Sequence, residues 1–535
     1  MTTRTDDTEK AVPAQVEDLS RLDTSTSRIG HLANQEDHEE TVSQCLRKHP
    51  VPVLWCCYGI WVILATAFDF AAPSAVIGIP QFRKDFGRPF AGNYVLPANW
   101  QAAFSGAPVA SGCIGSLITG WLGEKIGMKR MLLLGFINIL IGTTIQIIAT
   151  TNAVFFVAKF IGGFSIGIGL TTIFSYLGEI APTPIRGILT AASAITFVLA
   201  QLIVALILNY ISDGTTRWTY RGLFCGQYAI TAIAMVGLPF MPESPYWLIR
   251  HGKEEKATRA LRRLGYKTDE IEKRIANIKV TLEEARGETE KASYLECFKK
   301  SNLRRTMVAV MPICIQNVGG AYFILAYLTY YAQLSGYSPS MSFKINIAAQ
   351  CVSFLGCVAS WPMVERFGRR PLNLYGTALL TVILWICGGL ATVTTSTTFL
   401  RGAISMFIIY LFVYTATIGS TAYTALGEVA TPRLRILTAA IGIILQNAIV
   451  CVLAFVIPYI FNPDKANLGG KTAFIFGGFS ILSTIYMFFC HPETAGRSFE
   501  EIDEMFIKHV PARQFSSFKT DAEVRGKMVA AELKN

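Results

Sequence analysis

Long apolar runs recur along the chain and constrain its fold more than any other feature. A helix needs about 20 apolar residues to cross a hydrocarbon core of about 30 Å. Inside that core every backbone polar group must be bonded within the protein, which a helix achieves by itself. The runs therefore predict an all-α membrane protein with twelve transmembrane helices, near residues 53–76, 104–123, 131–150, 153–176, 190–211, 222–241, 305–331, 345–364, 372–392, 402–425, 437–460 and 472–490.

Charge composition argues against a soluble fold and against a nucleic-acid partner. Only 16% of the residues are charged, against about 25% in soluble domains. Residues 242–305 carry sixteen basic and eleven acidic side chains, so they contribute five of the eleven net positive charges. Basic loops stay on the cytoplasmic side of a membrane. We therefore expect this segment and both termini to be cytoplasmic.

The same charged segment divides the chain into two sets of six helices. The first tail is rich in Thr, Ser, Asp and Glu, which favours disorder. The cysteines have no metal-ligand spacing, so neither a metal nor a cofactor is expected. We expect a disordered cytoplasmic tail at 1–49, a six-helix bundle at 50–242, a cytoplasmic linker with short amphipathic helices at 243–303, a second six-helix bundle at 304–491 and a cytoplasmic tail at 492–535.

Three phrases occur twice, in the same order and at offsets of 249, 241 and 250 residues. Self-similarity of this kind indicates two copies of one structural unit in the same orientation. Two facing copies imply a pathway between them. The paired phrases are "LGEIAPTPIRGILTAA" and "LGEVATPRLRILTAA", "GEKIGMKR" and "VERFGRR", and "PES" and "PET".

The charged side chains of these phrases fall at the inner ends of the helices. We expect them to form a cytoplasmic gate, pairing across the two copies while the inside is shut and separating when it opens, because partly buried ion pairs resist screening. The alternative is that they are orientation signals and helix caps. The gate residues are Glu124, Lys129, Arg130, Glu179, Arg186, Glu243, Glu365, Arg369, Arg370, Glu428, Arg435 and Glu493.

Two charges fall deep inside apolar runs, at Asp69 and Lys159. A charge in the middle of a membrane helix costs about 2.5–3.5 kcal/mol on insertion scales, so it indicates a functional site. A carboxylate beside an ammonium keeps its charge, and it takes up a proton when their spacing or solvation changes. Such a pair would couple proton movement to transport. The alternative is a static ion pair that holds two helices together.

Jointly, the motifs resemble those of the sugar porters of the major facilitator superfamily over about residues 50–507. The marks are "GWLGEKIGMKR", "GEIAPTPIRG", "PESPYWLI", "ERFGRRPL" and "PETAGRSFEEID". The stretches "QNVGGAYFILAYLTYYAQLSG", "GEVATPRLR" and "PYIFNPDKANLGGKTAFIFGG" are similar to the fungal α-glucoside, or maltose-type, permeases. The resemblance implies two six-helix bundles that expose a solute site to each side of the membrane in turn.

The resemblance also implies which residues contact the solute and the proton. Sugar hydroxyls need neutral hydrogen-bonding groups and aromatic faces. The family's solute positions match Gln201, Gln316, Asn317, Tyr423 and Asn447, with Tyr322 where hexose carriers have an asparagine. Each polar member has the alternative role of bonding a neighbouring helix. Asp69 matches the aspartate of proton-coupled members, while Lys159 replaces their arginine.

The sequence therefore predicts a multi-pass plasma-membrane carrier, acting as a monomer, that imports an α-linked disaccharide such as maltose by proton symport. Its partners would be the sugar, protons and the lipid bilayer, and no bond of the substrate would be altered. A membrane enzyme is disfavoured because no nucleophile–base pair, metal cluster or phosphate loop is found. The open alternatives are a hexose facilitator without proton coupling and a transporter-like sugar sensor.

Overall fold

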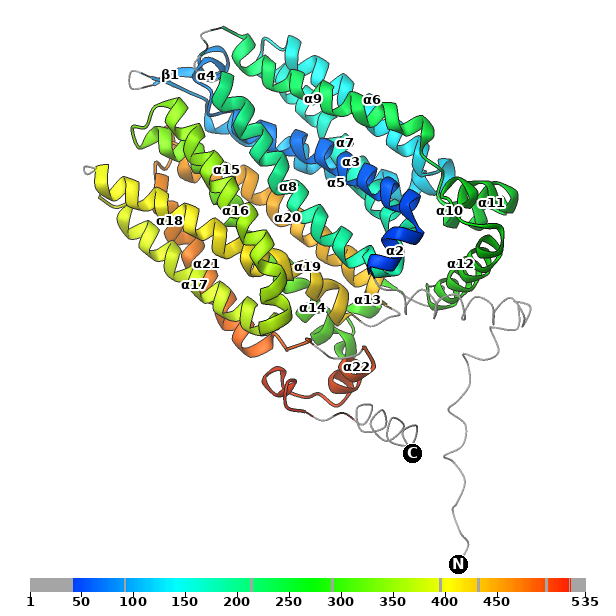
Figure 1. Ribbon diagram of the computed structural model, residues 1–535. Helices are drawn as coiled ribbons and strands as arrows, with labels where there is room; N and C mark the ends of the chain where they lie inside the picture. The colour runs from blue at the N-terminus through cyan, green and yellow to red at the C-terminus, as the bar shows by residue number, and fades with distance from the viewer. Residues whose placement is uncertain are drawn as a thin grey trace, which may run out of the picture.

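The computed structural model describes residues 42–90, 93–211, 214, 216–289, 293–393, 397–430, 434–495, 499–518 and 520. These residues form a bundle of long helices that run alongside one another (Figure 1). Eleven helical segments are long and apolar enough to cross a membrane, and α8 (Thr183–Ile211) adds a further helix of 29 residues. The prediction of twelve membrane helices in an all-α fold is confirmed.

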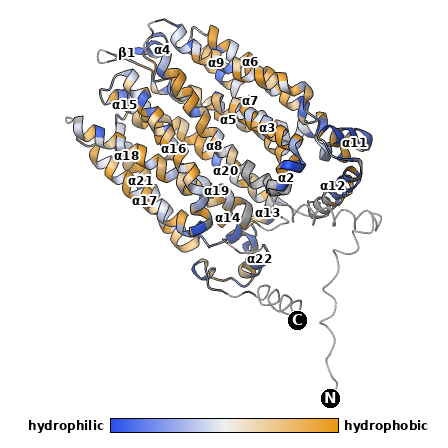
Figure 2. Cartoon of the chain, viewed as in Figure 1, coloured by the Kyte–Doolittle hydropathy of each residue, from blue (hydrophilic) through white to orange (hydrophobic). Residues whose placement is uncertain are grey.

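The first half of the bundle contains six long helices. Figure 2 shows them largely hydrophobic along their lengths, as expected for helices that face lipid on one side and protein on the other. They are α3 (Pro50–Val76), α5 (Ala98–Ile126), α6 (Met128–Ile148), α7 (Asn152–Ile180), α8 and α9 (Trp218–Gly237), the last continued by the short helix η2 (Leu238–Phe240).

The second half also crosses the membrane six times, but two of its spans are broken. The pieces α14 (Lys300–Val318) and α15 (Ala321–Leu334) share one apolar span, as do α18 (Thr397–Ala416) and α19 (Ile418–Val429). Discontinuous helices expose backbone groups near the middle of a membrane protein and commonly line solute sites. The remaining spans are α16 (Pro339–Phe367), α17 (Arg369–Leu390), α20 (Arg435–Phe461) and α21 (Thr472–Cys490), with η4 (Gly469–Lys471) ahead of the last.

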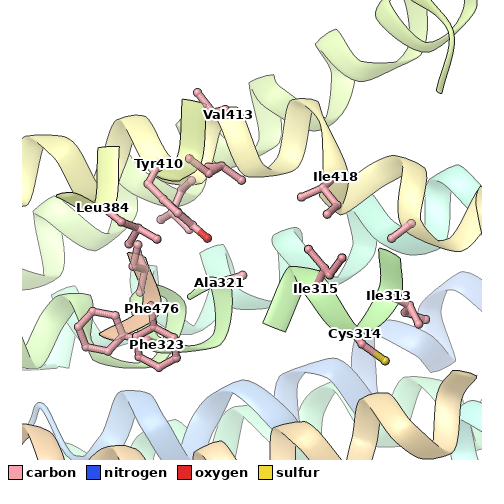
Figure 3. Close-up of a cluster of buried hydrophobic side chains, with 14 of the residues drawn as sticks. Ile313, Cys314, Ile315, Ala321, Phe323, Leu384, Tyr410, Val413, Ile418 and Phe476 are labelled. Atoms are coloured by element: carbon pink, nitrogen blue, oxygen red, sulfur yellow. The ribbon is translucent and has the colours of Figure 1, made fainter. Parts of the chain in front are cut away.

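Backbone conformation explains both breaks. Gly320 has φ 102°, a left-handed conformation that side chains other than hydrogen rarely allow. Thr417 has φ −120° and ψ −104°, which also ends a helix. Apolar side chains pack densely around both breaks (Figure 3), including Ile315, Ala321, Phe323, Tyr410, Ile418 and Phe476.

Short polar helices gather at one end of the bundle, which we call the linker end (Figure 1). In Figure 2 α2 and α11 are largely hydrophilic. The group comprises α2 (Val42–Lys48), α10 (Pro245–Arg250), α11 (Glu254–Arg263), α12 (Thr268–Thr289), α13 (Tyr294–Cys297), α22 (Phe499–Ile507) and η5 (Ala512–Gln514).

Helix α2 lies inside the tail that was expected to be disordered up to residue 49, so that prediction is wrong for Val42–Lys48. The reason is a tertiary contact with the linker. Lys48 pairs with Glu270 of α12 at 3.8 Å, and the ring of His49 lies 5.1 Å from that of Tyr266. Docking of this kind offsets the conformational entropy that keeps a polar tail disordered.

The opposite end, which we call the hairpin end, carries α4 (Pro80–Phe86) and a two-stranded antiparallel sheet. Strand β1 (Arg88–Phe90) pairs with β2 (Asn93–Val95), with Arg88 opposite Val95. The two halves pack together through α5 against α20 and through α8 against α16. At the hairpin end Phe343 of the second half is fully buried in an apolar cluster made otherwise of first-half residues.

A glutamate caps the start of α6 in the first half. Gly127, between α5 and α6, has φ 93°, and a Cβ there would lie 2.7 Å from the Glu243 carboxylate. That carboxylate accepts hydrogen bonds from the backbone N–H groups of Met128 and Lys129 at 3.0 and 3.3 Å. A carboxylate at a helix N-terminus satisfies unpaired N–H groups and the helix dipole.

The second half repeats this arrangement. Gly368 has φ 83°, and Glu493 accepts hydrogen bonds from the backbone N–H groups of Arg369 and Arg370 at 3.0 and 3.1 Å. The repeated phrases of the sequence thus correspond to repeated contacts in the structure. In this state Glu243 and Glu493 act as helix caps, and their predicted role in a gate stays a prediction.

Candidate functional site

The two predicted intramembrane charges lie together in the first half. The Nζ atom of Lys159 on α7 is 4.0 Å from Oδ1 of Asp69 on α3, and their side chains are only 1% and 7% exposed. Gln146 of α6 lies beside the carboxylate, and a Cβ on residue 162 would be 3.0 Å from Asp69 Oδ2. Gly162 therefore leaves room for the carboxylate between α3 and α7. The site can hold a charged pair, or a protonated carboxyl group beside an ammonium.

A cluster of amides and tyrosines occupies the broken helices of the second half. Gln316 and Asn317 are buried at the end of α14, just before the break. The hydroxyl of Tyr414 donates to Oε1 of Gln316 at 3.0 Å, and that of Tyr410 donates to the Gly319 carbonyl at 2.8 Å. Two tyrosines of α18 thus fix the broken end of α14. Tyr410 and Tyr414 were not predicted, although their spacing of four in an apolar run was a signal.

Tyr423 connects this cluster to α20. Its side chain is 49% exposed, and it exchanges hydrogen bonds with the amide of Gln446 at 3.3 and 3.1 Å. The predicted eleventh-helix amide, Asn447, is the next residue, and it is Gln446 that contacts Tyr423. The cluster therefore presents neutral donors, acceptors and a ring face, which are the groups that recognise a sugar.

The other predicted solute residues occupy separate positions. Tyr322 follows the break, at the start of α15, and is partly buried. Asn317 donates to the Ile313 carbonyl of its own helix at 3.3 Å. Gln201 lies on α8 of the first half and is partly buried. The structure thus brings Gln316 and Tyr423 into one network with Gln446, while Gln201 belongs to the other half of the bundle.

Two sets of polar contacts join the halves at the hairpin end, and the first centres on Gln333 of α15. Its Oε1 accepts from the Arg83 guanidinium at 2.8 Å, and its Nε2 donates to the Gly78 carbonyl at 2.8 Å. The Arg83 guanidinium also lies 5.8 Å from the centre of the Tyr330 ring. A single second-half side chain thus holds two first-half groups.

The second set involves the loop after α20. Asp464, whose side chain is 1% exposed, pairs with Arg88 at 3.0 Å and accepts from the Ala98 N–H at 3.4 Å. Asn462 donates to the Leu96 carbonyl at 3.4 Å. Together with the buried Phe343, these contacts close the hairpin end. We call the Gln333 and Asp464 contacts the latch.

Four of the predicted gate residues, Glu124, Lys129, Glu179 and Arg370, have side-chain partners in their own half or in the adjoining linker. The Ser244 hydroxyl donates to Glu179, and the Arg250 guanidinium lies 3.5 Å from Glu124. Lys129 donates to the carbonyls of Pro239 and Met241, and Arg370 donates to the Phe488 carbonyl at 3.1 Å. Arg130 is exposed. The side chains of Arg186, Glu365, Glu428 and Arg435 lie outside the described residues.

A buried histidine closes the last helix at the linker end. The amide of Asn373 on α17 lies 3.0 Å from Nε2 of His491, which follows α21. Burial, with a smaller effect of the Arg370 charge, lowers the pKa of His491 to about 4. The imidazole is therefore neutral near pH 7 and packs as a hydrogen-bonding structural group.

Most of the chain matches a single protein-family model, and similar proteins are found over nearly its whole length. The family model described as "Sugar (and other) transporter" matches residues 57–506. The general alpha-glucoside permease of Saccharomyces cerevisiae is 29% identical over 506 residues, covering 92% of this chain and 82% of that protein. A maltose permease of the same yeast is 28% identical over 511 residues, covering 94% and 83%.

Solved structures show the same fold. The inward-open conformation of the xylose transporter XylE from E. coli superimposes with a TM-score of 0.69 at 18% identity, covering 84% of this chain and 99% of that one. The XylE proton:xylose symporter bound to 6-bromo-6-deoxy-D-glucose gives a TM-score of 0.68 at 18% identity. At this level of identity the comparison supports the arrangement of helices alone.

Proposed function

The chain belongs to the sugar transporter family of the major facilitator superfamily, and on that premise we propose that it imports an α-glucoside disaccharide such as maltose together with a proton. The observation that carries the proposal is the pairing of Asp69 with Lys159 inside one half, with the amide–tyrosine cluster inside the other. The names of the yeast relatives, an alpha-glucoside permease and a maltose permease, support the substrate class.

Transport would proceed by alternating access. The hairpin end would face outward and the linker end the cytoplasm, with the chain acting as a monomer in the plasma membrane. The latch then corresponds to the state in which the outside is closed. In the opposite state Glu179 would leave Ser244 and pair with the second-half arginines, and Glu428 would pair with those of the first half.

Proton coupling would reside at the charged pair. In the outward-open state Asp69 takes up a proton, the attraction to Lys159 weakens, and sugar binds to Gln316, Tyr423 and Gln446. Closing the latch prevents the sugar and the proton from returning to the outside, and both are released in the inward-open state. The proton follows its gradient, so the sugar can accumulate against its own. No bond of the sugar is altered.

The test is to express the chain in cells lacking their own sugar carriers and to follow labelled maltose, sucrose, trehalose and glucose uptake with external pH. We expect uptake of an α-glucoside accompanied by alkalinisation of the medium. Uptake without alkalinisation would replace symport by facilitation, and uptake of glucose alone would replace the substrate. Failure to transport any sugar would contradict the proposed function and would favour the alternative of a transporter-like sugar sensor.

The latch gives a separate prediction. Gln333→Ala removes two hydrogen bonds that join the halves, each worth about 0.5–1.5 kcal/mol. The outward-open population should therefore rise by about fivefold or more. The measurement is the rate at which an impermeant thiol reagent modifies a cysteine introduced at Thr329, which is buried against Gly78 while the hairpin end is closed.

A matched control is Arg217→Ala, which removes an ion pair with Asp85 at 3.3 Å at the same end but within one half. Its labelling rate should equal that of the parent carrying the introduced cysteine alone. Equal rates in Gln333→Ala and Arg217→Ala would show that the latch does not set the equilibrium between the two states.

A further inference from the structure

We propose that Phe155 and Phe224 form an aromatic box that positions Lys159 and stabilises its charge when Asp69 is protonated. The proposal rests on proton symport as the proposed function and names further positioning residues for it. The Nζ atom lies 5.1 Å from the centre of the Phe224 ring and 5.7 Å from that of Phe155. Both rings are fully buried, and neither can offer a hydrogen bond.

The contacts of the ammonium show why it needs the rings. Lys159 is 1% exposed, and within the described chain its Nζ has no hydrogen-bond partner. Asp69 at 4.0 Å is the titratable group that faces it, and beside that carboxylate Gln146 of α6 is neutral. When Asp69 takes up a proton, the counter-charge disappears while the ammonium stays buried. Ring faces attract a cation most strongly where water is absent.

The aromatic box also explains why position 159 can hold a lysine in place of an arginine. A guanidinium spreads its charge over a plane and forms several directed hydrogen bonds, whereas an ammonium is a compact charge that is costly to bury alone. Two ring faces supply attraction without requiring a hydrogen-bond acceptor. The box therefore lets a lysine hold its charge through the cycle at a position where the resembling carriers have arginine.

The box is connected to the closure of the hairpin end. The Phe155 ring lies 4.8 Å from Phe104 and 5.3 Å from Phe82, and the same apolar cluster contains Phe343 of α16, from the other half. When the hairpin end opens, Phe343 leaves the cluster and the rings around Lys159 lose their packing. The charge on Lys159 is therefore best stabilised while the hairpin end is closed.

The experiment compares the pH dependence of maltose binding by the purified full-length carrier. Phe224→Leu and, independently, Phe155→Leu remove a ring while keeping an apolar side chain. Losing a ring destabilises the charged lysine, so the alkaline limb of the binding profile should move down by about one pH unit, which corresponds to about 1.4 kcal/mol. Phe224→Tyr, which keeps the ring, should retain the parent profile.

The control is Phe136→Leu, which removes a ring buried in a different cluster, away from the ammonium. It should weaken the fold to a similar degree without moving the limb. If the Leu variants at 155 and 224 behave like Phe136→Leu, the rings are ordinary packing and the box is wrong.

A second readout separates the box from the proposed function. The thermal unfolding midpoint of the same variants is followed against pH without any sugar. If the parent binds no maltose or accumulates none, the proposed function fails, and the box still stands provided that Phe224→Leu and Phe155→Leu shift the unfolding profile and Phe136→Leu does not. If the parent accumulates maltose and neither profile shifts, the box fails and symport stands.

Discussion

Asp69→Asn is expected to abolish accumulation of sugar against its gradient while leaving exchange down a gradient in place. The asparagine side chain has the same shape as the aspartate and cannot take up the proton. A proton moving through 100 mV supplies about 2.3 kcal/mol, enough for roughly fiftyfold accumulation at about 1.4 kcal/mol per factor of ten. The variant should fall to a ratio of about one.

The measurement is uptake of labelled maltose to steady state, with exchange between preloaded and external sugar measured in the same cells. Exchange serves as the internal control, because removing one member of a buried pair leaves the other charge uncompensated and can destabilise the fold by about 3–5 kcal/mol. Lys159→Arg is the companion variant, and it should still accumulate sugar. Unchanged accumulation in Asp69→Asn would exclude Asp69 as the proton carrier.

Gln316→Ala is expected to raise the maltose concentration for half-maximal uptake by about five- to 150-fold. Gln316 is buried at the break of α14 and accepts the Tyr414 hydroxyl. Its removal takes away an amide available to the sugar and leaves that hydroxyl unpaired. The loss of the amide contact with the sugar is worth about 1–3 kcal/mol in a buried site, which sets the expected range. The proton dependence of uptake should be preserved, since Asp69 lies in the other half.

The control for this variant is Gln350→Ala. Gln350 is a buried glutamine of the same half, and its amide bonds to Asn346 of its own helix at 3.2 Å. Gln350→Ala should change the half-maximal concentration by less than about twofold, because it removes only a contact with Asn346 within one helix and none with the amide–tyrosine cluster. If Gln316→Ala and Gln350→Ala have equal effects, the amide–tyrosine cluster does not bind the sugar.

Part of the candidate site could be predicted from the sequence, because charged residues are rare inside apolar runs and stand out there. Asp69 and Lys159 are charges inside apolar runs, and a charge in that setting is costly enough to require a partner. Gln316 and Asn317 were reached through a motif. The contact of Gln446 with Tyr423 was not predicted, because one step along a helix turns a side chain by about 100° and the sequence does not say which face meets the neighbour. The solute role of Asn447 stays a prediction.

Contacts between segments far apart in the chain could not be predicted from the sequence, for a similar reason. Arg83 and Gln333 are 250 residues apart, and Arg88 and Asp464 are 376 apart. Each is an ordinary polar residue in a loop or at a helix end, where many pairings satisfy the same chemistry. Only the packing of the two halves decides which pairs meet.

The sequence by itself determined the twelve helices, the division into two repeated halves and the family, because membrane length, apolar composition and repetition are local properties of the chain. The tertiary structure decided that Asp69 meets Lys159, that Glu243 and Glu493 cap helices more than 100 residues away, and that two rings enclose the lysine. These depend on helix rotation and on the spacing between helices. Both are set by packing over the whole bundle, which no short stretch of sequence specifies.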